Sequence, residues 1–111
     1  MIDKGLVSGS TTLLVLSLLS EKDMYGYEMI EELTQRSQNV FELKTGTLYP
    51  LLHQLVKTNC LISYEQEVKG KKRKYYQLTK TGKIYLASKI KEWDTYSSTV
   101  SAILGGVSYE H

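Results

Sequence analysis

The feature that most constrains the fold of this chain is a change of hydrophobic period near its middle. From Leu61 to Val68 and from Arg73 to Thr79 the side chains alternate in character at every second position, and Lys69–Lys72 lies between the two runs as a turn. On both sides of this stretch the apolar period is three to four residues, as in amphipathic helices. We therefore predict a β-hairpin enclosed between helices, in a mainly α (α+β) fold.

Three helices are expected before the hairpin and one after it. The first begins at the capping residues Ser8–Thr11 and is apolar almost all round, so it should be buried on most sides. The second runs from about Tyr25 to Ser37 and turns Tyr27, Ile30 and Leu33 toward the core. A very short strand is predicted at 39–43.

The third helix, from Thr45 to Lys57, separates an apolar arc from a polar one when its residues are placed at 100° intervals. Pro50 needs a position in the first turn, which favours Thr47 as the N-cap over Thr45. The apolar arc should face the core, and it comprises Leu48, Leu51, Leu52, Leu55 and Val56. The opposite arc is free for contacts, with Thr47 and Tyr49 on its flanks, and comprises Gly46, Pro50, His53, Gln54 and Lys57.

The last helix has Thr79 or Thr81 as its cap and Gly105-Gly106 as its stop. Apolar residues follow one side of it in alternating steps of three and four. So small a domain cannot cover a stripe of this length, and we predict that a second copy of the chain does so. The stripe comprises Leu86, Ile90, Trp93, Tyr96 or Ser97, Val100, Ile103 and Leu104.

The charges of the chain are unevenly distributed, although the net charge is only +2. Residues 1–43 hold seven Asp and Glu against three Lys and Arg, whereas residues 44–91 hold eleven Lys and Arg against two Glu. The hairpin tip, residues 69–74, holds five basic residues and one glycine. Such a concentrated positive field is typical of nucleic-acid binders.

Several classes of protein are disfavoured by what the sequence contains. The two histidines, His53 and His111, have no carboxylate or thiol at a useful spacing, and no phosphate loop, metal motif or nucleophile motif occurs. We therefore predict neither an enzyme nor a cofactor. The single cysteine, Cys60, is expected to pack as a small hydrophobe. The apolar run Leu13–Leu19 is too short for a membrane span, so a cytoplasmic location is expected.

The third helix and the hairpin together predict a winged helix-turn-helix. A helix fits the ~12 Å wide major groove of DNA, and a basic hairpin beside it can neutralise neighbouring phosphates. The alternative is a winged helix that serves only protein–protein contacts. The basic tip favours DNA, because a module of that kind does not need it.

Three stretches of the chain resemble the signatures of PadR-type regulators, over roughly residues 6–104. They are Tyr25-Gly26-Tyr27-Glu28, Gly46–Leu55 and Lys72–Gly82. Two departures stand out: Lys44-Thr45 replaces a common Ser-Pro, and Asn59 replaces a common glycine in the turn after the third helix.

The resemblance implies a winged-helix DNA-binding domain followed by one long helix, which builds a homodimer together with the first helix. We accordingly expect a DNA-binding domain at 1–79 and a dimerisation helix at 80–106. It also implies that the protein is a repressor of transcription that binds operator DNA. The expected DNA contacts are Tyr25, Lys44, Thr45, Thr47, Tyr49, Pro50, His53, Lys57, Lys71, Lys72, Arg73 and Lys74. The expected dimer contacts are Leu13, Leu16, Leu86, Ile90, Trp93, Val100, Ile103 and Leu104.

Trp93 is a candidate effector-binding residue. It resembles a position in the short multidrug-sensing members of the family, where two tryptophans flank a flat ligand. An aromatic pair across a two-fold axis makes a stacking slot, Asp94 would favour a cation, and Tyr96 would extend the wall. Simple interface packing of Trp93 is the alternative.

Overall fold

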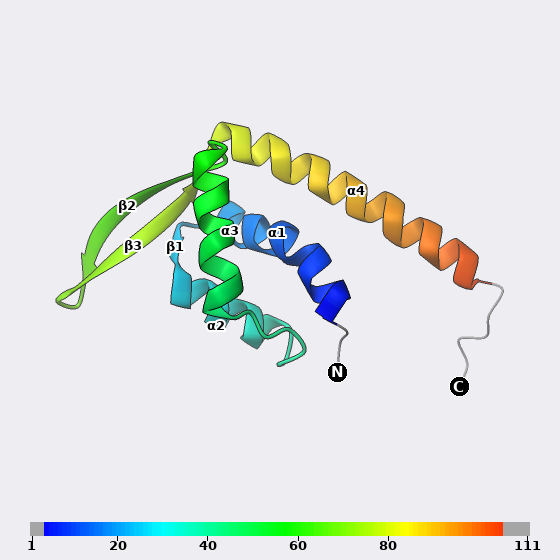
Figure 1. Ribbon diagram of the computed structural model, residues 1–111, viewed down its shortest axis with the longest axis horizontal. Coiled ribbons are helices and arrows are strands. Elements are labelled where there is room, and N and C mark those ends of the chain that lie inside the picture. The colour runs from blue at the N-terminus through cyan, green and yellow to red at the C-terminus, as the bar shows by residue number, and fades with distance from the viewer. Residues whose placement is uncertain (1–3, 106–111) are drawn as a thin grey trace.

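The computed structural model describes the backbone of residues 4–105 and the side chains from Gly9 onward (Figure 1). Its elements follow the predicted order of three helices, a hairpin and a fourth helix, which confirms a mainly helical winged helix. The elements are α1 (Lys4–Glu21), β1 (Met24–Tyr25), α2 (Gly26–Arg36), α3 (Thr45–Lys57), β2 (Leu61–Val68), β3 (Lys71–Leu78) and α4 (Lys80–Leu104).

The hairpin is completed by a third strand that the sequence analysis missed. The sheet is antiparallel with the order β1-β3-β2, and β1 pairs Met24 with Tyr76 and Tyr25 with Tyr75. A two-residue strand is too short to show a period, so only its tertiary partner reveals it. The strand predicted at 39–43 is wrong, because none forms there: Gln38 and Asn39 adopt left-handed backbone angles, with φ of 53° and 68°.

The turn of the hairpin is shorter than predicted. It consists of Lys69 and Gly70, with φ of 52° and 80°, and positive values at both central positions match the right-handed twist of the strands. Lys71 and Lys72 therefore belong to β3 and not to the turn. They pair with Val68 and Glu67 of β2.

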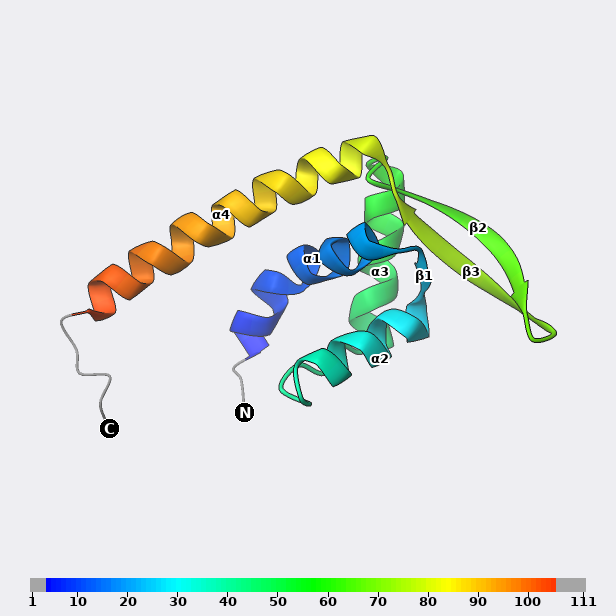
Figure 2. The same cartoon turned by 180° about the vertical axis from the view of Figure 1, so that it is seen from behind.

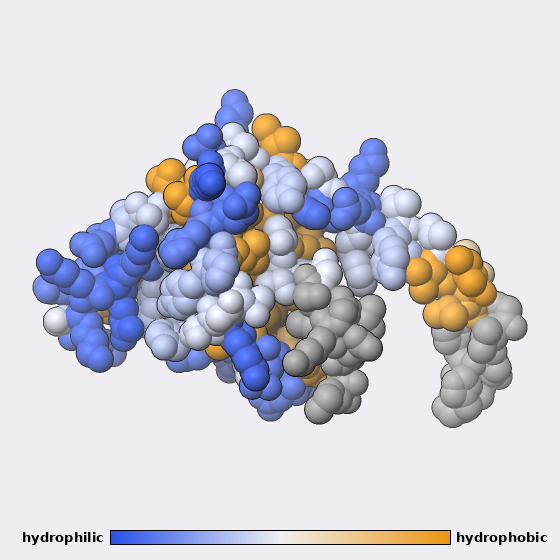
Figure 3. Space-filling model, viewed as in Figure 1, coloured by the Kyte–Doolittle hydropathy of each residue, from blue (hydrophilic) through white to orange (hydrophobic). Residues whose placement is uncertain are grey.

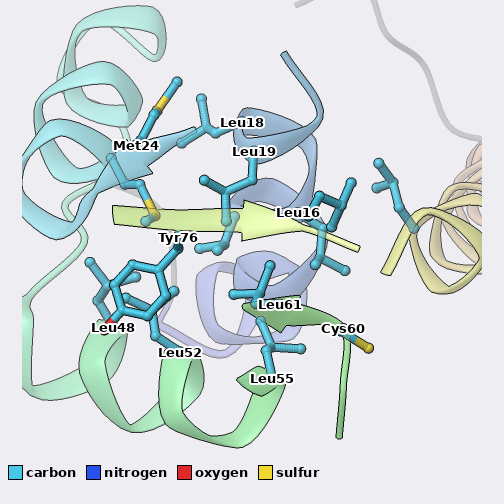
Figure 4. Packing of buried hydrophobic residues seen from close by; sticks show 14 of the residues in the cluster. Leu16, Leu18, Leu19, Met24, Leu48, Leu52, Leu55, Cys60, Leu61 and Tyr76 are labelled. Carbon is cyan, nitrogen blue, oxygen red and sulfur yellow. The ribbon is translucent and has the colours of Figure 1, made fainter. Parts of the chain in front are cut away.

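The hydrophobic core lies where α1, α2, α3 and the sheet meet. Figure 4 shows the Tyr76 ring next to Leu48 and Leu52 of α3, and α1 is buried on most sides as predicted. On α2 the expected core face is partly wrong. Met29 is fully buried there, whereas Tyr27 is 54% exposed.

Two helix starts differ from the predictions. α1 begins at Lys4, so the capping residues at 8–11 lie inside the helix. α3 begins after Lys44 as its N-cap, not at Thr47, and Pro50 stands in the second turn. The hydrogen bond that Pro50 cannot donate would reach the carbonyl of Gly46, which is exposed and thus open to water. The N-cap of α4 is Thr79, which is one of the two predicted alternatives. Its side chain accepts a hydrogen bond from the Gly82 N–H at 2.9 Å.

α4 packs against α1 at its start and then runs beyond the rest of the domain (Figures 1 and 2). The radius of gyration is 16.0 Å, against about 13 Å for a compact chain of this length. Within residues 4–105 no helix is long and apolar enough to cross a membrane.

Candidate nucleic-acid interface

The outer face of α3 is polar and open to solvent. Its inner face is buried through Leu48, Leu52 and Leu55, as the helical period predicts. Most of the predicted contact residues of this helix are exposed together on the other side. They are Lys44, Thr45, Thr47, Pro50, His53 and Lys57, and Gln54 is exposed with them.

Tyr49 is the exception among the predicted contacts of α3. It is half-buried and packs on the first residue of α2: a Cβ at Gly26 would overlap the Tyr49 hydroxyl and lie 2.7 Å from Cζ. Tyr49 is thus the predicted DNA contact of α3 that also packs within the domain. Its ring holds α2 and α3 together, because Gly26 leaves room for it.

A tight turn links α3 to the hairpin. The Cys60 N–H donates to the Leu55 carbonyl at 2.9 Å, and the Asn59 N–H donates to the Val56 carbonyl at 3.0 Å, with Asn59 at a φ of 66°. These two bonds form a Schellman motif, which satisfies the last carbonyls of the helix. The prediction that Asn59 occupies a position suited to glycine is confirmed.

The basic residues of the hairpin, which we call the wing (β2, β3 and their turn), divide between its two faces. Lys72 and Lys74 point to the face that continues into the core, where they stand opposite Glu67 and Glu65. Lys71 and Arg73 point to the other face, which we call the open face. The predicted basic tip thus has two surfaces: on one, lysines stand opposite glutamates, and on the other, Lys71 and Arg73 stand opposite the uncharged Val68 and Gln66. Figure 3 shows the hydrophilic residues gathered over the wing.

Three tyrosines cross the open face in a single row, one from each strand. Tyr25 of β1 and Tyr64 of β2 both pair with Tyr75 of β3. The rings of Tyr64 and Tyr75 stack with centroids 5.7 Å apart, and Tyr25 meets Tyr75 edge-on at 5.4 Å. The Arg73 guanidinium lies 4.7 Å from the centre of the Tyr25 ring. We call Tyr25, Tyr75 and Tyr64 the tyrosine row.

Asp23, between α1 and β1, anchors this row. Its carboxylate accepts a hydrogen bond from the Tyr64 hydroxyl at 2.5 Å and another from Gln77 Nε2 at 3.2 Å. The hydrogen bond to Asp23 raises the pKa of the Tyr64 phenol to about 12, and partial desolvation adds to the rise. Sequence reasoning missed Asp23, Tyr64, Tyr75 and Gln77, and the alternation of the strands was the one signal that grouped Tyr64 with Ile62 on a face.

A second candidate site lies between α1 and α4. It is a cavity of about 280 Å³ lined by Gly9, Ser10, Leu13, Lys89, Glu92, Trp93 and Tyr96. The rings of Trp93 and Tyr96 lie 6.2 Å apart, and Lys89 Nζ is 3.4 Å from the Glu92 carboxylate. Trp93 and Tyr96 thus line one cavity within a single subunit. Asp94 does not line this cavity, and Glu92 is its acidic residue.

The predicted dimer contacts separate into two groups. Leu16 is fully buried and Leu86 is 8% exposed within one subunit, so both belong to the core and are corrected. Leu13 and Val100 are half-buried. The others are exposed on α4: Ile90, Trp93, Ile103 and Leu104. Figure 3 shows hydrophobic residues at the far end of this helix.

Among the described residues no three His, Cys, Asp or Glu side chains gather as metal ligands. Cys60 is buried beside Leu55 and Leu61, as predicted for a packing residue.

The sequence model of the PadR-like transcriptional regulator family matches residues 15–88. The chain belongs to this family. It is therefore a transcriptional regulator and not an enzyme, as the sequence predicted.

Relatives of this PadR family member agree in sequence and fold. It is 29% identical to the transcriptional regulator Rv3488 of Mycobacterium tuberculosis, over 86% of this chain and 83% of that one. A transcriptional regulator of Clostridium thermocellum superposes with a TM-score of 0.85 at 29% identity, covering 92% of this chain and 97% of that chain. A PadR family regulator of Eggerthella lenta gives 0.79 at 31% identity, covering 90% and 86%.

Proposed function

We propose that this regulator binds operator DNA with α3 and the wing, as a homodimer, and represses transcription. The observation that carries the proposal is the polar, exposed outer face of α3 beside a wing with five basic residues. In this proposal the base-contacting residues are on α3, led by Thr47 and His53. The wing lysines and Arg73 neutralise phosphates beside the groove.

Selection from random duplexes, followed by a salt titration, tests DNA binding. Replacing Lys71, Lys72 and Arg73 with Ala should weaken binding to operator and random duplexes alike. It should also flatten the salt dependence by about one unit of slope per lost phosphate contact. His53→Ala should instead reduce the preference for the selected operator.

A matched control removes the same charge elsewhere. Replacing Lys80, Lys83 and Lys91 of α4 with Ala lowers the net charge equally, and all three residues are exposed. This variant should keep most of the salt slope. An equal loss in both triple variants would contradict a specific role for the wing. No duplex binding by the wild type would instead favour a protein–protein module.

We further propose that residues 1–79 bind DNA and that the helix at 80–106 dimerises; residue 106 lies outside the described residues. The exposed apolar stripe of α4 supports this, because large apolar side chains that stay in contact with water raise the free energy of the monomer. A two-fold dimer of this kind reads half-sites about one helical turn apart, or a multiple of it.

We also propose that the cavity between α1 and α4 admits a small planar aromatic effector, with Trp93 and Tyr96 as its aromatic wall. Stacking contributes about 0.5–1.5 kcal/mol per aromatic pair beyond area burial. Glu92 lines the cavity and is paired with Lys89 at 3.4 Å, so a cationic guest would bind by replacing Lys89 at the Glu92 carboxylate. Effector and operator affinities must then be linked reciprocally.

Fluorescence of Trp93, the single tryptophan of the chain, reports on this cavity. Planar cationic dyes should quench it and release operator DNA, and Trp93→Ala should abolish release. Glu92→Gln should weaken the binding of cationic dyes more than the binding of flat phenols. Asp94→Asn makes the same charge change outside the cavity and should not have this effect. If no dye quenched the fluorescence, or if operator DNA were still released in Trp93→Ala, Trp93 would be only a packing residue.

A further inference from the structure

Arg73 differs from the lysines around it. It is half-buried, whereas Lys71, Lys72 and Lys74 are exposed. Its guanidinium lies over the ring of Tyr25, and this contact limits the orientations that the planar fork of N–H donors can adopt. Lys74 also approaches a ring, with its Nζ 5.9 Å from the centre of the Tyr76 ring on the opposite face of the sheet. The Arg73 guanidinium lies closer to its ring, at 4.7 Å, and a charge whose orientation is set beforehand loses less entropy on binding.

The support of Arg73 can be followed across the sheet. Tyr25 rests edge-on against Tyr75, and Tyr75 stacks on Tyr64. Tyr64 donates its hydroxyl hydrogen to Asp23. Each contact joins a different strand or loop, so the position of the guanidinium depends on groups far from it in sequence.

Asp23 is the charged end of this series. It binds both wing strands at once, through Tyr64 of β2 and Gln77 of β3, and it stands two residues after the end of α1, which packs in the core. The wing is otherwise a hairpin that projects from the domain (Figure 1). A carboxylate fixed to the core that accepts two hydrogen bonds from the wing limits how far the wing can pivot.

We propose that Asp23 is a positioning residue for DNA binding, which locks the tyrosine row and thereby holds the Arg73 guanidinium in the orientation that DNA requires. Asp23 itself contacts no DNA in this arrangement. The inference rests on the proposed function, because it assigns a role within the same DNA interface. It also separates the basic residues of the wing: the lysines supply charge, and Arg73 supplies an oriented contact.

The sign of the expected effect makes the inference testable. Asp23→Asn removes a negative charge, and on electrostatics alone this should tighten binding to the DNA polyanion. The positioning role predicts the opposite. We expect operator binding to weaken about fivefold in Asp23→Asn and in Tyr64→Phe, which keeps the stacked ring. Glu31→Gln, an exposed carboxylate on α2 with the same charge change, should not weaken it.

A double-mutant cycle with Arg73→Lys identifies the target of the positioning. Arg73→Lys keeps the charge and loses the planar fork. In that background Asp23→Asn should cost less than about twofold in operator affinity, since the oriented contact is already lost. An equal loss in both backgrounds, or no loss with Arg73 present, would overturn the inference.

A readout without DNA checks the contact itself. Burial also raises the pKa of Tyr76, so the titration is read as a difference between variants. In an alkaline absorbance titration one late-titrating tyrosine should be absent from Tyr64→Phe, and in Asp23→Asn one should move toward the ordinary pKa of about 10. An unchanged titration would also overturn the inference. Failure of the wild type to bind any duplex would remove the proposed function with it, whereas a binding wild type with unaffected variants removes the inference alone.

Discussion

At Gly26 the missing side chain is a packing requirement and not a matter of backbone angles. The residue opens α2, and the ring of Tyr49 from α3 occupies the space that a Cβ would take. Gly82 is similar, because a Cβ there would overlap the Cys60 carbonyl at the joint of α4 and the hairpin. Both glycines allow close approach between elements that the sequence keeps far apart.

Gly26→Ala should destabilise the protein by about 1–3 kcal/mol, the usual range for overpacking a filled site. Gly9→Ala is the control: it lies in α1 with nothing within 4 Å of the added Cβ, so it should stabilise by about 0.5–1 kcal/mol through helix propensity. Urea unfolding at one fixed protein concentration measures both changes. Similar values for the two variants would contradict the packing argument.

Tyr64 makes stability depend on alkaline pH. Its pKa in the folded state is about 12, above the ordinary value of 10.0, so the folded protein favours the neutral phenol. The stability that this hydrogen bond contributes is fully present below pH 10 and is lost as the pH rises through about 12. Tyr64→Phe should remove this contribution to the loss of stability at alkaline pH, and thermal unfolding between pH 10 and about 12 measures it. Tyr27→Phe, an exposed tyrosine, should leave the pH profile unchanged.

At the scale of elements, the wing is held at both of its ends. The Schellman turn after α3 sets where β2 begins, and Thr79 ends β3 by capping α4. The Thr79 hydroxyl also donates to the Asn59 carbonyl at 2.6 Å. The turn and the cap therefore form one joint, and its geometry depends on the left-handed angles of Asn59.

Replacing Asn59 tests this joint. Asn59→Ala should destabilise the protein by about 1 kcal/mol, because alanine lacks the short polar side chain that lets asparagine adopt a φ of 66°. Asn59→Gly should be neutral or slightly stabilising, since glycine adopts this angle freely. Chemical denaturation compares the two. A larger loss for glycine than for alanine would contradict the assignment of strain to this residue.

At the scale of the whole molecule, α4 leaves more apolar surface exposed than one subunit can cover. Ile103 is 73% exposed and Trp93 is 49% exposed, and they follow one side of a 25-residue helix. Leu86 near the start of the helix is in the core, so the helix joins the domain at one end and projects at the other. This asymmetry favours a second copy as the partner of the projecting part.

Val100→Asp combined with Ile103→Asp should convert the proposed dimer to a monomer that no longer protects an operator, because charges would be buried in the proposed apolar interface. Ile84→Asp is the control, an exposed isoleucine of α4 outside the predicted stripe, and it should leave the dimer intact. Sedimentation at micromolar concentration distinguishes the two states. A monomeric wild type would count against the dimer.

Local patterns determined much of this protein. The helical period placed the buried leucines of α3 on one side and its polar residues on the other, and alternation located both strands of the wing. The cap of α4 was narrowed to Thr79 or Thr81, because capping depends on the chemistry of a few neighbouring residues, and the resemblance to the family marked Asn59 as a glycine position. The helix ends at Gly105 as predicted, but Gly105 has right-handed angles, with φ of −60°, and not those of a left-handed glycine cap. The three stretches near Tyr25, Pro50 and Arg73 were sufficient to identify the family.

The tertiary structure decided what depends on partners distant in sequence. β1 exists because β3 lies beside it, and Met24 and Tyr25 alone carry no period. The tyrosine row follows from strand register, which brings Tyr25 and Tyr64 to either side of Tyr75. Packing likewise turned Tyr49 inward and placed Glu92, not Asp94, in the cavity. A local pattern reports which side of an element is apolar, whereas only the packed chain determines which element covers it.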